Sequence, residues 1–194
     1  MTVLPDWMYL GPEGLTVAEY EALPEEVRRR IEVVDGAIIV SPSPSRAHQI
    51  FARRLANKLE EACATRSAVA TDVDLRLYDV PLYHRRPDIV VYDADLADEE
   101  DLQPQHCLLV VEVMSPGSVD TDRFDKPREY AHAKIEHFWR VEKVNDAKSA
   151  PIMYRYRLSP TTDSYLLVGE DVGRVDISEP FKLSLDLSNL TEPH

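Results

Sequence analysis

The order of hydrophobic and polar residues predicts a hairpin early in the chain. Residues 30–40 form two runs rich in β-branched side chains, and Asp35-Gly36 separates them. An Asp-Gly pair between such runs is typical of a tight β-turn. Before this hairpin, Thr16 and Glu19 have the spacing of a capping box, which predicts a short helix that ends near Pro24.

Residues 46–63 have the apolar spacing of an amphipathic helix, and the segment 41–45, rich in Ser and Pro, precedes it. The helix has a basic side, formed by Arg46, Arg53, Arg54 and Lys58. This side is either a solvated outer face or a surface that contacts phosphate groups.

The rest of the chain is mostly strand-like. Strands are predicted at 69–78, 89–92, 107–113 and 137–141, with a polar loop at 93–105 and a turn at 143–150. A hairpin is predicted from 152–158 and 165–168, and the alternating segment 181–187 is predicted to be an edge strand. A further helix is expected from Asp125 to Lys134, with Asp125 as its cap and Pro127 in its first turn.

These elements together predict an α/β or α+β fold with a mixed central β-sheet, flanking helices and a terminal β-hairpin. We expect one domain over residues 1–194, since this length is usual for a single domain. Its parts are an irregular lead-in at 1–14, a core at about 15–142, and a C-terminal hairpin and edge strand at 143–194.

Composition adds an expected location. The chain is 44% hydrophobic and 29% charged, with no apolar run long enough to span a membrane and no secretory leader pattern. Cys63 and Cys107 are far apart and fit neither a disulfide framework nor a zinc site. We therefore expect a cytoplasmic protein that is not bound to a membrane.

The formal net charge of −13 counts against a nucleic-acid ligand, because phosphate contacts usually require a basic surplus. Net charge is a sum over the whole surface, so it does not exclude a local basic groove.

Two carboxylates carry the strongest chemical signal. Asp88 precedes an apolar run and Glu112 ends another. If these strands pair antiparallel, the two carboxylates meet at one edge of the sheet, close enough to share a divalent ion. Mg²⁺ (or Mn²⁺) is typically held by one or two carboxylates and waters. Alternatively, each acidic residue simply marks a solvated strand end, although Glu112 follows a buried run where a charge needs a partner.

The surrounding residues resemble a known family. Pro87-Asp88 and Glu112-Val113-Met114 resemble the motif of the PD-(D/E)xK nuclease superfamily. The wider order of signals over about 14–192 is similar to a bacterial group of restriction-endonuclease-like proteins. That order comprises 32–36, Ser41-Pro42, His48, 86–89, 111–116, 122–126, Tyr130 and Phe138-Trp139.

This resemblance implies a restriction-endonuclease-like fold, dependence on Mg²⁺ and cleavage of phosphodiester bonds. It also implies a homodimer by analogy and adds the carbonyl of Val113 to the metal ligands. One position departs from the motif, because Met114 stands where a lysine is expected. The resemblance places a migrated lysine on the following helix, where Lys126 matches. Spacing alone favours an exposed lysine at a helix start, whereas the resemblance favours a catalytic role for Lys126.

Other candidates are less specific. Glu32 matches an additional metal ligand of such nucleases or is a strand-edge glutamate. His48, Arg53, Arg54, Arg86 and Tyr130 are candidates for substrate binding, while Arg86 could instead pair with acidic residues of a loop. Asp122 and Asp125 are expected to be helix caps.

The leading hypothesis is therefore a Mg²⁺-dependent endonuclease that acts on DNA, with Asp88, Glu112 and Lys126 as catalytic residues and Glu32, Asp88, Glu112 and Val113 as metal ligands. Two alternatives remain. One is a catalytically silent protein of the same fold with a binding or regulatory role, and the other is a non-nuclease whose acidic surface meets a basic protein.

Overall fold

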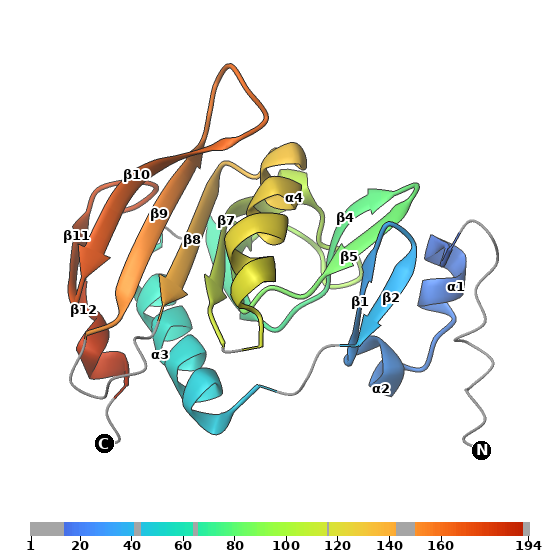
Figure 1. The fold of residues 1–194 in the computed structure, drawn as a ribbon, viewed down its shortest axis with the longest axis horizontal. Helices are drawn as coiled ribbons and strands as arrows, with labels where there is room; N and C mark the ends of the chain where they lie inside the picture. The colour runs from blue at the N-terminus through green and yellow to red at the C-terminus, as the bar shows by residue number, and fades with distance from the viewer. Residues whose placement is uncertain (1–13, 41–43, 64–65, 116, 143–149, 192–194) are drawn as a thin grey trace.

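The structure is a computed structural model that describes residues 14–40, 44–63, 66–115, 117–142 and 150–191 (Figure 1). The expected lead-in before residue 14, the Ser-Pro break at 41–43 and most of the expected turn at 143–150 lie outside these residues. In the described part of the chain, no helix has the length and apolar character required to cross a membrane.

A six-stranded mixed sheet forms the centre of the fold, in the order β10-β9-β8-β7-β6-β3. Only the β7–β8 pair is parallel; all other neighbours in this sheet are antiparallel. The strands are β3 (Ser67–Thr71), β6 (Ile89–Asp93), β7 (Cys107–Val113), β8 (His137–Glu142), β9 (Ile152–Leu158) and β10 (Tyr165–Val172). This arrangement confirms the expected α+β class with a mixed central sheet.

Helices α3 (Arg46–Ala62) and α4 (Lys126–His132) pack on opposite faces of this sheet, so each face has its own buried cluster (Figure 1). The cluster on the α3 face includes Phe51 and Trp139. The cluster on the α4 face includes Tyr130 and Phe138. Strand β7 contributes to both clusters because its continuous apolar run is covered on both sides.

A second, four-stranded sheet has the order β2-β1-β5-β4 and lies beside the α4 side of the central sheet (Figure 1). Its strands are β1 (Ile31–Val34), β2 (Ala37–Val40), β4 (Leu75–Asp79) and β5 (Leu82–Arg85), and α1 (Val17–Glu21) and α2 (Glu25–Arg28) precede it. The predicted hairpin is confirmed as β1 and β2. Asp35 and Gly36, with φ of 54° and 73°, make the turn that Asp-Gly favours.

Two predicted strands differ in part from the structure. The expected strand 69–78 is broken at Asp72, whose φ of 53° turns the chain out of the central sheet, so β3 and β4 belong to different sheets. The segment 181–187 does not form an edge of the central sheet. Its strand β12 (Leu183–Asp186) pairs only with β11 (Arg174–Ile177), and a 3₁₀ turn at Leu187–Leu190 follows.

The helix expected from Asp125 begins earlier. A π-helical turn at Thr121–Asp125 runs directly into α4, and Asp125 itself has helical dihedral angles and no capping hydrogen bond. Asp125 is therefore not the cap of this helix. A π-helical turn widens the helix locally, and such turns often occur at functional sites.

Candidate functional site

Asp88 and Glu112 lie side by side at one end of the central sheet. Strands β6 and β7 pair antiparallel with Ile89 opposite Val111, so the residues just beyond this pair are neighbours. The Val113 amide donates a 2.7 Å hydrogen bond to Oδ2 of Asp88. The expected antiparallel pairing of these strands is confirmed.

His48 holds the other oxygen of Asp88. Ser45 caps α3 by accepting from the His48 amide, which places the His48 side chain in the first turn. Nε2 of His48 lies 2.8 Å from Oδ1 of Asp88. Since both Asp88 oxygens have a protein partner, the position of this carboxylate is well defined.

Lys126 lies between two buried carboxylates. Its Nζ is 2.9 Å from Oε1 of Glu112 and 3.1 Å from Oδ1 of Asp122, and only 8% of the residue is exposed. Burial alone would lower the pKa of Lys126, but the Glu112 and Asp122 carboxylates outweigh it and raise this pKa above the usual lysine range. Lys126 is therefore a buried ammonium and not an exposed lysine at a helix start.

Glu112 is almost fully buried and accepts a 2.7 Å hydrogen bond from the Tyr130 hydroxyl. Burial raises the pKa of Glu112, Lys126 opposes this shift, and the nearby Asp122 and Asp88 carboxylates add to it. We call the group formed by Asp88, Glu112, Asp122 and Lys126 the carboxylate rim. Its three carboxylates face a single ammonium, so a bound cation would relieve the excess negative charge.

Asp122 is a site residue that the sequence interpretation missed. It is not a helix cap: it is 2% exposed, accepts from the Ser118 hydroxyl and pairs with Lys126. Its position four residues before Lys126 could have indicated this, because residues at that spacing lie on one side of a helix.

Glu32 belongs to a neighbouring ion network. Its Oε2 accepts from Arg85 and its Oε1 from the Arg86 amide, both at 3.0 Å. Arg85 also donates two 2.7 Å hydrogen bonds to Glu129 on α4. One Glu32 oxygen thus pairs with the Arg85 guanidinium and the other accepts from a backbone amide, while the Glu32 carboxylate is near enough to Lys126 to raise its pKa. Among the described residues, no group of three His, Cys, Asp or Glu side chains is arranged to hold a metal ion.

The other expected substrate-binding residues are dispersed. Arg53 is exposed on α3, and Arg54 donates to the Leu190 carbonyl near the end of the chain. Arg86 pairs with Asp74 at 2.8 Å, which agrees with the loop-pairing alternative. Tyr130 is fully buried, so in this structure it orients Glu112 and has no surface to offer a substrate.

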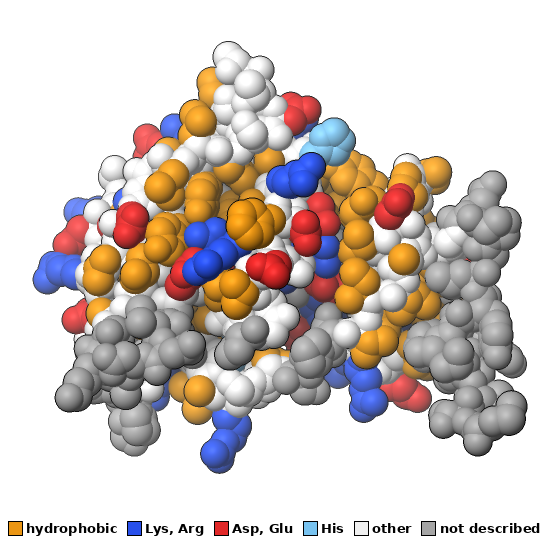
Figure 2. All heavy atoms as spheres, in the orientation of Figure 1, with side chains coloured by type: hydrophobic (Ala, Val, Ile, Leu, Met, Phe, Trp, Pro, Cys, Tyr) orange, Lys and Arg blue, Asp and Glu red, His pale blue; other side chains and the backbone are white. Residues whose placement is uncertain are grey.

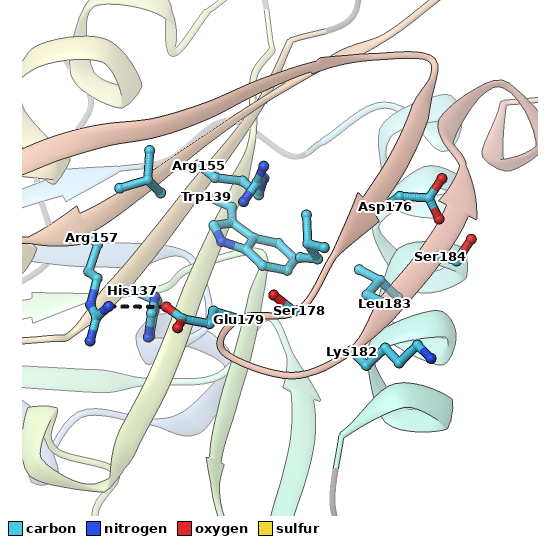
Figure 3. Close-up of a pocket in the computed structure, with 12 residues that line it drawn as sticks. His137, Trp139, Arg155, Arg157, Asp176, Ser178, Glu179, Lys182, Leu183 and Ser184 are labelled. Atoms are coloured by element: carbon cyan, nitrogen blue, oxygen red, sulfur yellow. Dashed lines mark hydrogen bonds and ion pairs between the residues drawn. The ribbon is translucent and has the colours of Figure 1, made fainter.

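A cavity of about 560 Å³ lies away from the rim, between β8–β9 and the β11–β12 sheet (Figure 3). Trp139 in its wall belongs to the cluster on the α3 face, whereas Tyr130 and Lys126 are on the α4 side. Two of its arginines are already paired, Arg155 with Asp171 and Arg157 with Glu179. Size alone would favour this cavity, but these arginines are neutralised by acidic partners, and the unbalanced buried charge lies at the rim.

The comparisons with known proteins concern the family and the fold. A family model described as "Uma2: Putative restriction endonuclease" matches residues 17–186, a range that contains every residue of the rim. No curated protein matches the chain.

Among solved structures, the chain is similar to one described as a "putative nuclease belonging to DUF820" from Anabaena variabilis. The TM-score is 0.68 at 15% sequence identity, and the match covers 92% of this chain and 99% of that chain. At this identity the likeness establishes the fold, a nuclease-like fold. Because the family model spans most of the sequence, the chain belongs to the Uma2 family of restriction-endonuclease-like proteins.

Proposed function

We propose that the protein is an endonuclease that depends on a divalent metal and hydrolyses phosphodiester bonds of DNA at the carboxylate rim. The observation that carries this proposal is the buried Lys126 ammonium, which contacts Glu112 beside Asp88. A lysine and two acidic residues at one sheet edge are the groups that the PD-(D/E)xK motif combines. Here the lysine comes from a helix, because Met114 occupies the usual place.

The rim has a donor set that suits Mg²⁺. Asp88 and Glu112 would hold the ion with the carbonyl of Val113, and waters would complete its shell. When bound, Mg²⁺ supplies charge neutralisation of the phosphate and a lowered pKa for water. Glu32 is the further ligand that the resemblance adds; its Oε2 pairs with the Arg85 guanidinium and its Oε1 accepts from the Arg86 backbone amide.

The protein residues have separable tasks. Tyr130 and His48 fix the two carboxylates through hydrogen bonds of 2.7 Å and 2.8 Å. Lys126 remains charged between Glu112 and Asp122, and we assign it to the negative charge that develops on the phosphate oxygens. A charge placed in advance in a buried site stabilises the transition state with little reorganisation.

Plasmid nicking with Mg²⁺ or Mn²⁺ tests the proposal, with Asp88→Asn and Glu112→Gln beside the wild type. Each variant keeps the size of the side chain but removes a metal-binding charge, so we expect cleavage to be lost. Calorimetry should show weaker binding of Mn²⁺ to Asp88→Asn. Equal cleavage by folded wild type and Glu112→Gln would contradict the assignment.

A catalytically silent binding protein of the same fold is the second candidate. It is favoured by the direct Lys126–Glu112 ion pair and by the absence, within the described ranges, of a three-donor metal group. This candidate predicts DNA binding without cleavage under any divalent metal. The homodimer implied by the resemblance stays a prediction.

A further inference from the structure

A pair of arginines shares one carboxylate close to the rim. Arg123, in the π-helical turn, donates to both oxygens of Glu142 at 3.1 Å and 2.6 Å. Arg140 on β8 lies 3.0 Å from the same carboxylate. Two guanidinium groups therefore meet at this one carboxylate, in a chain with a formal charge of −13.

The strand register places Arg140 next to the rim. Arg140 is the partner of Glu112 on β7 and of Tyr154 on β9, so the three side chains share the α4 face. Its guanidinium lies 4.8 Å from the ring centre of Tyr154 and 5.6 Å from that of Tyr156. Arg140 is 9% exposed, and its Nε has no hydrogen-bond partner among the described residues.

An exposed aromatic side chain directly follows Arg123 in the chain. Phe124 follows Arg123 in the π-helical turn and is 63% exposed, although Lys126 and Asp122 on either side of it are buried. Figure 2 shows hydrophobic side chains directly beside Lys and Arg side chains in the middle of this face, over the start of α4 and β8. We call Arg123, Phe124, Arg140 and Tyr154 the arginine–aromatic platform.

We propose that this platform binds a single-stranded stretch of DNA beside the scissile phosphate, with the arginines on its phosphates and Phe124 stacked on an unpaired base. The inference rests on the proposed function and names the form of its substrate. An aromatic ring can stack on a base only where that base is not already stacked within a duplex. The arginines supply local positive charge for the phosphates of the backbone in a chain whose formal net charge is −13.

Fluorescence anisotropy in EDTA tests this, with a labelled single strand of about 20 nucleotides and the same strand annealed to its complement. We expect tighter binding of the single strand by the wild type. Phe124→Leu should weaken single-strand binding about tenfold, since it keeps apolar area but removes the ring, while Phe124→Trp should retain it.

Charge variants test whether the arginines of the platform bind DNA or only form a structural contact. Arg123→Gln should weaken binding and make the salt dependence of log K shallower by about 0.7. Arg128→Gln is the matched control, because Arg128 is an exposed arginine of α4 outside the platform. Glu142→Gln should strengthen binding about threefold or more, since it frees both guanidinium groups. If the contact of Glu142 with Arg123 and Arg140 is only structural, Glu142→Gln should not strengthen DNA binding.

Equal binding by wild type, Phe124→Leu and Arg123→Gln would overturn the platform, as would equal or tighter binding of the duplex by the wild type. Because EDTA removes the metal, these readings do not depend on cleavage. A wild type that never nicks DNA would refute the proposed nuclease in the cleavage assay alone.

Discussion

The carboxylate rim and the cavity beside the β11–β12 sheet contrast in the balance of their charges. The cavity offers about 560 Å³, but its Arg155 and Arg157 are paired with acidic residues. The rim gathers three carboxylates around one buried ammonium. Burying carboxylates close together costs stability, and proteins tolerate that cost mainly at functional sites. The comparison indicates that unbalanced burial of charge is a better guide to the site than cavity size.

The largest expected effect on stability is the loss of a buried ion pair, compared with the loss of an exposed one in the cavity wall. Arg85→Met leaves Glu32 and Glu129 without their shared guanidinium beside α4, where the Arg85 side chain is 2% exposed. Removing one partner of a buried pair costs about 3–5 kcal/mol. Urea unfolding measures this loss. Arg157→Gln in the cavity wall is the control, with a side chain that is 50% exposed and an expected cost of about 0–1 kcal/mol. Equal losses of stability in the two variants would contradict the expected difference between a buried and an exposed ion pair.

The second prediction concerns activity. Lys126→Ala should lose about 10²–10³ in cleavage rate, because it removes a positioned charge from the transition state. Lys182→Ala, the same change in an exposed lysine that lines the cavity, should cleave like the wild type.

The rates are measured by plasmid nicking, together with thermal melts in the presence and absence of Mg²⁺. The melts are needed because Lys126→Ala leaves Glu112 and Asp122 without their ammonium. Wild-type rates from a folded Lys126→Ala protein would remove Lys126 from catalysis.

The smallest effect is a pH dependence on the cavity side. Burial lowers the pKa of His137 below its usual value near 6.5, and Arg157 adds to this shift while Glu136 opposes it. The unfolded chain therefore binds the proton more readily than the folded protein. The cost to stability is absent above the unfolded-state pKa and grows as pH falls through it toward the folded-state pKa.

We expect His137→Gln to lose less stability than the wild type on acidification from neutral pH. Urea midpoints at several pH values measure this. Parallel curves for the two proteins would show that His137 does not titrate differently in the folded state.

Much of the rim could be predicted locally. Asp88 and Glu112 flank apolar runs, and antiparallel pairing of those runs brings their ends together whatever the rest of the fold does. Only the family resemblance indicates a catalytic role for Lys126, since spacing alone favours a surface lysine. Asp122 was assigned as a cap because its burial depends on how the π-helical turn packs against β7, which no local pattern encodes.

By itself the sequence determined the elements whose signals are short-range, namely the Asp35-Gly36 turn, the Ser45-capped helix and the apolar run of β7. Tertiary structure decided which charges meet. It broke the expected strand at Asp72, enclosed Glu32 with Arg85, and set Arg140 beside Glu112 through a parallel pairing of distant strands. The physical reason is that ion pairing and burial depend on separations between residues far apart in sequence, whereas turns and caps depend on neighbours along the chain.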